Sequence, residues 1–438
     1  MKKTIYKYIV WVFIISFILF LKFAEWREET KNIKLGIFSG SMYDVPTMQS
    51  YKIFDEAIDS FTHENKKVKI SYEYGVLKND YSEWLSSKIL YGESPDIMVV
   101  LEEDFNTFVS LGILEPLDKY MEADKEFDKN LFYEQALSLG KSDSSQYALP
   151  MEIDPVLLFV NKTLMKKEGI TLDKDNWTWE KFYDVCQNVT KDLNNDGVID
   201  QFGVVDFTWQ DLVYTNGETF FSKDGTKAEF DKKGVVEAIN FAQKLYNLNH
   251  NANPQKEDFD KGNVLFKPFP FSWYRVYNSY PYRLIRYSNF EWECIKLPKG
   301  PNGKNSSQLK GYLIGISSKS KNKKVAWKFL KKLVLDKEIQ GDIFKYSQGV
   351  PVLKEITESA KANEELKKYN PEENISIDKR ILSEIVEDSV ISYKFKNYEK
   401  ILKQADLNIN QMIYENKDIE SSIPYLNKEL NNLINKEL

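Results

Sequence analysis

Histidine and cysteine are scarce in this chain, and their scarcity excludes several kinds of chemistry. The only histidines are His63 and His250, and the only cysteines are Cys186 and Cys294. Two isolated histidines are too few for a zinc enzyme with several His ligands, and neither lies in a recognisable catalytic motif. We expect both at the surface. The cysteines either pair or act as small core residues, so no disulfide framework is predicted.

An excess of positive charge is also missing. The 438 residues carry 60 basic and 66 acidic side chains, a net charge of −6, so no nucleic acid partner is expected. Hydrophobic residues make up 42% and charged residues 29%, which is typical of a soluble globular protein and excludes a disordered, collagen-like or multi-span membrane chain. Aromatic residues reach 14%, which predicts either large cores or flat surfaces for ligand stacking.

The clearest local signal is an apolar run over residues 5–24, preceded by lysines. Its length is about the ~20 residues needed to cross a bilayer. Cleavage after Ala24 would place Lys22 at the −3 position, which is unfavourable, and no lipobox cysteine follows the run. For residues 1–30 we therefore favour an uncleaved transmembrane anchor, with the rest of the chain outside the cell membrane, over a cleaved signal peptide.

Beyond the anchor, strand and helix patterns alternate. Period-two and continuous apolar runs predict strands, and apolar residues at helical spacing predict the helices between them. The strands are expected over 33–38, 68–74 and 96–101, and the helices over 51–65, 81–91 and 105–111. Because ligands bind beyond the carboxyl ends of strands in open α/β sheets, the segments 39–43 and 102–104 supply candidate ligand-binding residues. These are Ser39, Tyr43, Glu102 and Glu103.

A second α/β unit follows with the same alternation. Its strands are expected over 156–160, 203–205 and 312–316, and its helices over 179–190, 235–248 and 323–335. From residue 355 the chain is rich in helix-forming lysine and glutamate. No internal repeat of 20–50 residues is found.

Four segments in this order resemble the extracellular solute-binding proteins of ABC importers, the group that includes maltose-binding protein. They are SPDI at 94–97 with LGILEPLD at 111–118, YALP at 147–150 with FVNK at 159–162, LKGYLIGI at 309–316 with SKNKKVAWKFL at 320–330, and GVPV at 349–352. The resemblance implies an α/β fold of the periplasmic-binding-protein-like type II, with two lobes, a hinge and an interlobe cleft. The bulky, proline-interrupted segment 267–273 departs from the small-residue strand of the family.

The resemblance also implies the domain boundaries and the partners. The N-terminal lobe would comprise residues 31–150 and 311–350, and the C-terminal lobe residues 151–310 and 351–438. Hinge crossings are expected at 150–155, 297–310 and 347–351. The family implies a monomer without a cofactor. It also implies two partners: a small-molecule solute of the carbohydrate class and ABC permease subunits.

Residue chemistry adds candidates for contact with a sugar. Aromatic rings cover the apolar faces of sugars, and carboxylates accept hydrogen bonds from the hydroxyls. Glu152 and Asp154 share one face of the expected hinge strand, where acidic side chains are costly unless they face a cleft. Core packing is the alternative for the two tryptophans. The further candidates for ligand binding are Glu152, Asp154, Trp209, Trp273 and Tyr312.

One segment resembles a calcium loop. Residues 192–200 match its first nine positions, including the glycine at position six, but Gly203 occupies position twelve, where the bidentate glutamate belongs. Two alternatives stay open: a calcium site, and a turn stabilised by Asx hydrogen bonds. The candidate metal ligands are Asp192, Asn194, Asp196 and Asp200.

Three classes of function follow. The leading one is a binding protein that captures a sugar or oligosaccharide and presents it to an ABC importer. The second is a membrane-anchored receptor that signals to a partner without transport. The third is a glycoside hydrolase that uses two carboxylates, for which no motif singles out a pair.

Overall fold

A computed structural model describes residues 16, 30–43, 51–250, 252, 254–277, 290–367, 379–392, 395 and 397–437. Among these residues no helix is long and apolar enough to cross a membrane. The predicted anchor over 5–24 lies outside the described residues except for Ser16.

A mixed sheet runs through the molecule in the strand order β2-β1-β3-β10-β6-β8-β7. β1, β2 and β3 pair in parallel, and β10 lies antiparallel between β3 and β6. β11 and β9 pair with β6, and β12 pairs with β10. The strands are β1 (Lys31–Gly36), β2 (Val68–Tyr72), β3 (Ile97–Val100), β6 (Ala148–Asn161), β7 (Phe202–Val204), β8 (Val264–Pro270), β9 (Trp292–Ile295), β10 (Gln308–Ile316), β11 (Val350–Pro351) and β12 (Val390–Ile391), with a separate hairpin of β4 (Lys141–Ser142) and β5 (Ser145–Gln146).

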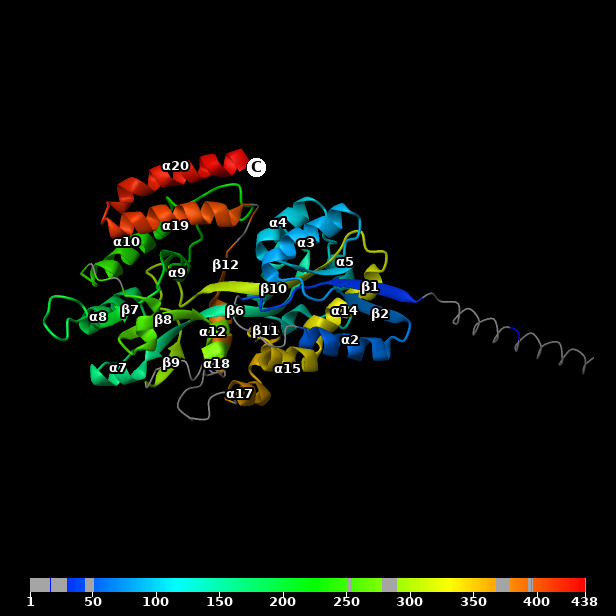
Figure 1. The fold of residues 1–438 in the computed structure, drawn as a ribbon, viewed down its shortest axis with the longest axis horizontal. Coiled ribbons are helices and arrows are strands. Elements are labelled where there is room, and N and C mark those ends of the chain that lie inside the picture. The colour runs from blue at the N-terminus through cyan, green and yellow to red at the C-terminus, as the bar shows by residue number, and fades with distance from the viewer. Residues whose placement is uncertain are drawn as a thin grey trace, which may run out of the picture.

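The first lobe packs helices on both faces of β1, β2 and β3, at the right of Figure 1. All four residues of β3 are buried, as expected for a strand covered on both faces. One core cluster joins these strands to α2, α14 and α15. The helices of this part are α2 (Lys52–Glu64), α3 (Lys78–Leu90), α4 (Glu102–Ser110), α5 (Asp118–Ala123), the 3₁₀ turn η1 (Lys129–Leu131), α6 (Glu134–Leu139), α14 (Lys323–Leu335), α15 (Lys337–Tyr346), α16 (Lys354–Thr357), α17 (Ala360–Lys367) and α18 (Lys379–Asp388).

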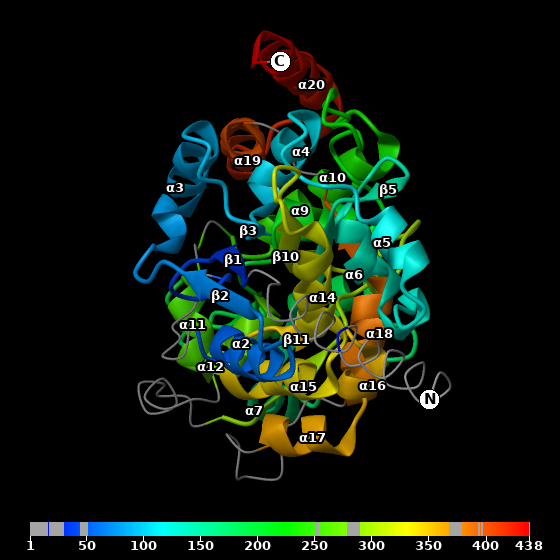
Figure 2. The same ribbon diagram turned by 90° about the vertical axis from the view of Figure 1, so that its right-hand side faces the viewer.

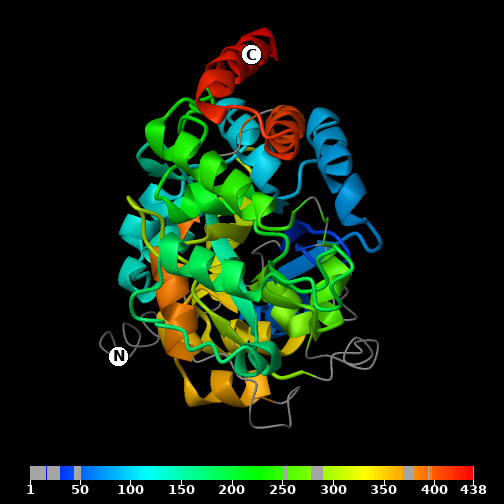
Figure 3. The same cartoon turned by 90° about the vertical axis from the view of Figure 1, so that its left-hand side faces the viewer.

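The second lobe surrounds β7, β8 and β9 and is seen end-on in Figure 3, with the C-terminal helices above it in red. Its core is a second cluster rich in aromatic side chains, to which α8, α10, α19 and α20 contribute their apolar faces. The helices are α7 (Lys162–Lys167), α8 (Trp179–Val189), α9 (Trp209–Thr215), α10 (Lys233–Asn247), α11 (Lys256–Asp260), α12 (Phe271–Tyr277), α19 (Tyr398–Tyr414) and α20 (Ile419–Glu437).

β6 is the long strand that joins the lobes. Its first half, Ala148 to Pro155, pairs with β10, and its second half, Val156 to Asn161, pairs with β8 and β9. The predicted hinge at 150–155 therefore lies at the point where β6 changes partners. After residue 351, α17 and α18 both pack with the first core, since Leu366 of α17 and Leu382 and Ile385 of α18 belong to that cluster. Val390 packs against the second core, and Phe395 and Tyr398 belong to it.

Several predicted elements are present with small shifts at their ends. The helix expected over 323–335 is α14, and those expected over 51–65, 179–190 and 235–248 are α2, α8 and α10. The helix expected over 105–111 begins earlier, at Glu102. Glu102 and Glu103 therefore lie in the first turn of α4, where acidic side chains are favourable beside the helix N-terminus.

Candidate ligand-binding cleft

A cavity of about 570 Å³ lies where β3, β6 and β10 approach one another, and both lobes contribute to its walls. The first lobe supplies Tyr43, the start of α3 and the junction of β3 with α4. The joining strands supply Asp154 and Lys310, and the second lobe supplies Pro270 and Glu399. A solute held here would contact groups from both lobes.

Glu102 is held by β10, whose Gly311 lines the same cavity. Its Oε1 accepts a hydrogen bond from the backbone N–H of Gly311 in β10 at 2.8 Å. Asp104 lies two residues after Glu102. Its Oδ1 accepts a hydrogen bond from the Ser82 hydroxyl at 2.9 Å, and burial raises the pKa of Asp104. The first turn of α4 thus presents three consecutive carboxyl groups, of which Glu102 and Glu103 line the cavity.

Glu152 and Asp154 are both buried, each 2% exposed, on one face of β6. Oδ1 of Asp154 accepts the backbone N–H of Ser272 at 2.8 Å. Burial raises the pKa of Asp154 to about 7, although the Ser272 hydrogen bonds and the charge of Lys310 oppose the shift. Burial likewise raises the pKa of Glu152 to about 7, and the charge of Asp154 adds to it. Each carboxyl can therefore accept or donate a hydrogen bond near neutral pH.

A small pocket of about 30 Å³ adjoins the main cavity at Met42 and is lined by Glu152 and Tyr312. Among the described residues, neither Oε2 of Glu152 nor the hydroxyl of Tyr43 has a hydrogen-bond partner. Both atoms approach Gly349: a Cβ at that position would lie 3.0 Å from each. Burial and the carboxyls of Glu152, Asp154 and Glu102 also raise the pKa of Tyr43. These two buried polar atoms have hydrogen-bonding capacity that a sugar hydroxyl could satisfy.

The predicted residues separate into groups. Tyr43, Glu102, Glu103 and Asp154 line the main cavity, and Glu152 and Tyr312 line the small pocket beside it. Ser39 lines neither: its backbone N–H donates to Val76 at 2.6 Å, and the residue bridges to Leu77.

The two tryptophans lie away from the main cavity. Trp209 is 2% exposed, packs against Phe220 and Phe230, and donates from Nε1 to Asp406 at 2.9 Å. Trp209 therefore packs in the core of the second lobe, which is the alternative that the sequence left open. Trp273 is 36% exposed on α12, 6.1 Å from the ring of Phe269, and does not line the cavity. Its stacking role stays a prediction.

Sequence reasoning missed three charged residues of the cavity. Lys78, Lys310 and Glu399 contribute to its walls, and Nζ of Lys78 donates to the backbone oxygen of Met42 at 2.6 Å. Lys310 lies in the segment 309–316 that carries the family resemblance, so its place beside the hinge strand could have marked it as a cavity residue. Glu399 lies at the start of α19, almost 250 residues after Asp154, so no local pattern indicates its position.

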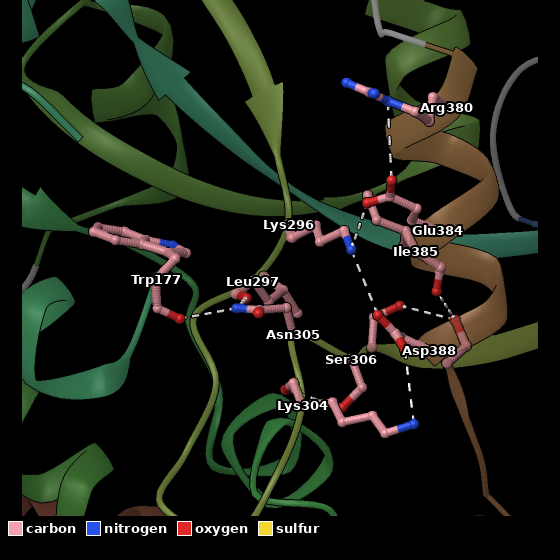
Figure 4. Close-up of polar contacts among 12 residues, drawn as sticks. Trp177, Lys296, Leu297, Lys304, Asn305, Ser306, Arg380, Glu384, Ile385 and Asp388 are labelled. Atoms are coloured by element: carbon pink, nitrogen blue, oxygen red, sulfur yellow. Dashed lines mark hydrogen bonds and ion pairs between the residues drawn. The ribbon is translucent and has the colours of Figure 1, made fainter. Parts of the chain in front are cut away.

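The segment 296–307, which links the second lobe to β10, is fixed on two sides (Figure 4). On one side Asn305 donates to the backbone oxygens of Trp177 at 2.9 Å and Leu297 at 2.7 Å. On the other side Lys296 pairs with Glu384 at 2.7 Å and Asp388 at 3.5 Å on α18. This part of the predicted 297–310 hinge therefore connects the second lobe to a helix that packs with the first core.

The calcium-like segment forms a tight turn. The Asp192 carboxylate accepts backbone N–H groups of Asn195 at 2.7 Å and Gly197 at 2.7 Å, and Asp200 accepts that of Leu193 at 3.0 Å. These bonds match the Asx-turn alternative. In the part of the chain that the structure describes, no group of three or more His, Cys, Asp or Glu is arranged to hold a metal ion. Cys186 and Cys294 are buried and unpaired, which is the core alternative for the cysteines.

Comparisons with known proteins identify the family and the fold. Residues 46–339 match the family model described as bacterial extracellular solute-binding protein. A binding protein of Brucella abortus is 25% identical over 292 residues, 63% of this chain and 67% of the relative. The galactooligosaccharide-binding protein of Bacillus subtilis is 25% identical over 244 residues, 54% of this chain and 55% of the relative.

Solved structures show the same fold. The sugar-binding protein MalE from Xanthomonas citri superposes with a TM-score of 0.75 at 15% identity, over 93% of this chain and 98% of that one. The cyclic alpha-maltosyl-1,6-maltose binding protein from Arthrobacter globiformis gives 0.74 at 16% identity, over 92% and 99%. Both confirm the type II periplasmic-binding-protein architecture.

Proposed function

Because the chain belongs to the bacterial extracellular solute-binding protein family, we propose that it captures a sugar or oligosaccharide between its lobes and presents it to an ABC importer. The observation that carries the proposal is the 570 Å³ cavity, whose walls come from both lobes and are rich in carboxylates. Carboxylates accept strong hydrogen bonds from hydroxyl groups, and a sugar offers many hydroxyls. The relatives named above that bind oligosaccharides support this class of solute.

The solute would be held mainly by Glu102, Glu103 and Asp154, with Tyr43 and Glu152 reaching its deepest hydroxyl. Glu102 and Asp154 each accept a backbone N–H, and Glu152 is buried, so these acceptors are oriented before the solute arrives. Preorganisation of this kind reduces the entropic cost of binding. The proposal includes no covalent step, and the protein is proposed as a binder and not as an enzyme.

Binding would favour closure of the lobes. A solute that contacts both walls gains its full set of hydrogen bonds only when the walls are close, so it shifts the population toward the closed state. β6 and the segment 296–307 would bend, since both run between the two lobes. The closed surface is then what the importer recognises.

A thermal-shift screen of the full chain tests the proposal. Neutral oligosaccharides, amino acids, peptides and polyamines are each added at increasing concentration. A solute that binds only the native state stabilises it by about 2.7 kcal/mol at a hundred times its dissociation constant, so the melting temperature rises with concentration. We expect oligosaccharides to give this response. A response to amino acids, peptides or polyamines alone would refute the sugar assignment.

An uptake assay separates import from signalling. Cells that lack the gene should fail to accumulate the labelled sugar identified in the screen, and the gene supplied again should restore uptake. Unchanged uptake with loss of a transcriptional response to the sugar would favour the receptor alternative.

A further inference from the structure

A groove of about 1120 Å³ lies at the end of the first lobe, between α5, α14 and the start of β1. Eight of the sixteen residues that line it are lysines, and only Asp124 and Glu126 are acidic. Figure 2 looks onto this end of the molecule, where α14 lies between α5 on the right and β1 and β2 on the left. Because the whole chain has a net charge of −6, the positive charge of this lysine-rich groove is local and does not reflect overall composition.

Some of the lysines are neutralised and others are not. Lys119 and Lys323 pair with the buried Glu115 at 2.5 and 3.0 Å, and Lys331 pairs with Asp124 at 2.8 Å. Among the described residues, no ion pair involves the other five lysines of the groove, all of them exposed: Lys31, Lys125, Lys321, Lys324 and Lys328. The unpaired charges form the rim and are available to an anionic partner.

The floor of the groove is aromatic. Tyr120 and Trp327 stack with their ring centroids 5.9 Å apart, and Nε1 of Trp327 donates to Asp124 at 3.0 Å. A rim of lysines over tyrosine and tryptophan suits the headgroup region of a bilayer. There ammonium groups meet phosphates and the lysine stems lie along apolar surface; Tyr120 is half-buried, and Trp327, only 5% exposed, forms the base beneath it.

The position of the groove in the chain points to the same partner. Lys31 begins β1 and lines the groove, only seven residues after Ala24, where the apolar run of the sequence ends. Seven residues span at most about 25 Å when fully extended. If residues 5–24 cross the membrane as the sequence predicts, this end of the first lobe is tethered close to the bilayer.

We propose that the lysine-rich groove docks on anionic phospholipid headgroups of the membrane from which the chain emerges. Docking would hold the first lobe against the bilayer and leave the interlobe cavity and the second lobe free to move. The tether keeps the groove near the surface, and the lysines act over a Debye length of about 8 Å at physiological salt. This inference rests on the predicted anchor and is independent of the identity of the solute.

The test uses the full chain in nanodiscs made of phosphatidylcholine alone or with a large fraction of phosphatidylglycerol. Hydrogen–deuterium exchange is followed in residues 317–324, at the rim of the groove. We expect exchange there to slow roughly threefold or more in the anionic discs and to recover in 0.5 M NaCl, because salt screens exposed charges.

Two matched variants separate docking from a general charge effect. Lys125, Lys321, Lys324 and Lys328 are changed to Gln in one variant. The other variant changes four exposed lysines of the second lobe to Gln: Lys227, Lys403, Lys428 and Lys436. The groove variant should lose the protection in anionic discs, and the control variant, which has the same net charge, should keep it.

Three results would overturn the proposal. The first is equal exchange in the two kinds of disc, and the second is equal loss of protection in both variants. The third is a chain that does not co-purify with nanodiscs, since the tether argument then fails. Equal protection in both kinds of disc is one form of the first result and would show that the groove does not select anionic lipid.

Discussion

The interlobe cavity and the lysine-rich groove differ in the sign of the charges that line them and in how deeply those charges are buried. Four carboxylates and two lysines line the cavity, whereas eight lysines and two carboxylates line the groove. The deepest cavity carboxyls are buried and have raised pKa values, but the unpaired groove lysines are exposed. Buried polar groups act at hydrogen-bond distance and are specific, while exposed charges act over several ångströms and are screened by salt.

The largest expected effect concerns the buried carboxyls of the cavity. Both pKa values of about 7 in the folded state exceed the ordinary values of Asp and Glu, so the folded state binds these protons more tightly. Stability should therefore fall as the pH rises from about 4 to about 7. The double variant E152Q/D154N should lack this fall and should exceed the wild type at pH 8 by a few kcal/mol. Urea unfolding followed by tryptophan fluorescence at each pH measures the difference.

A control of opposite sign is available at Asp224. Three hydrogen bonds from Ser222 and Thr226 lower the pKa of Asp224 to about 2. The variant D224N should lose stability above pH 4 relative to the wild type, and the two should converge as the pH approaches 2. If the free energy of unfolding of wild type and of E152Q/D154N changed in parallel from pH 4 to 8, the two carboxyls would not be buried in solution as the structure has them.

The second effect is on solute affinity. Asn at position 154 keeps the shape of Asp and can still accept the N–H of Ser272, but it loses the negative charge. A hydrogen bond to a charged acceptor contributes about 1.5–3 kcal/mol, so D154N should weaken sugar binding roughly 10- to 150-fold at pH 8. Calorimetry with the solute from the thermal-shift screen measures this change. The matched variant D192N, in the remote turn, should bind as the wild type does, and equal affinities of all three proteins would remove Asp154 from the site.

The third effect comes from filling the space beside Gly349. A methyl group there lies 3.0 Å from Oε2 of Glu152 and from the Tyr43 hydroxyl, so G349A should cost about 1–3 kcal/mol in stability. It should also weaken solute binding. At Gly341, inside α15, a Cβ would meet only Nζ of Lys361 at 3.8 Å. G341A should therefore stabilise the protein by about 0.5–1 kcal/mol, and destabilisation of similar size in both variants would point to a general intolerance of larger residues.

The smallest effect is expected at the interlobe ion pairs. Lys296 is largely buried between Glu384 and Asp388, but both carboxylates are partly exposed. K296Q should therefore lower stability by less than about 1 kcal/mol. K304Q should have no measurable effect, because Lys304 is 75% exposed and 3.8 Å from its partner. A loss of several kcal/mol in K296Q would show that this contact, and not β6, holds the lobes together.

The contrast between cavity and groove also shows what sequence patterns can reveal. Hydrophobic periodicity predicted α14 and β3. The strand-end rule selected Tyr43, Glu102 and Glu103, and the two-residue period of a strand selected Asp154. In the structure all four line one cavity. These inferences depend on local geometry that a short segment specifies by itself. The run SKNKKVAWKFL was recognised as a family segment, yet its lysines form a groove only after α5 and β1 pack beside α14.

The remaining site features depend on tertiary packing. Trp209 has the residue type of a stacking platform, but the aromatic core of the second lobe buries it. Glu399 reaches the cavity only because α19 returns to the cleft after α18 has packed with the first core. The domain boundary expected at residue 350 stays a prediction. In the described part of the chain α17 and α18 pack with the first core, and Val390 is the first residue after them that packs against the second.

The central claim is that a sugar binds between the lobes and closes them, and a distance measurement across the cleft tests it most directly. Spin labels are attached to S110C on α4 and L407C on α19, two exposed positions in different lobes, while the native cysteines are buried. Double electron–electron resonance on the full chain then compares the distance distribution with and without the sugar from the thermal-shift screen. Closure around the sugar should shift the distribution toward shorter distances at saturation. An unchanged distribution at saturation would contradict closure around the solute.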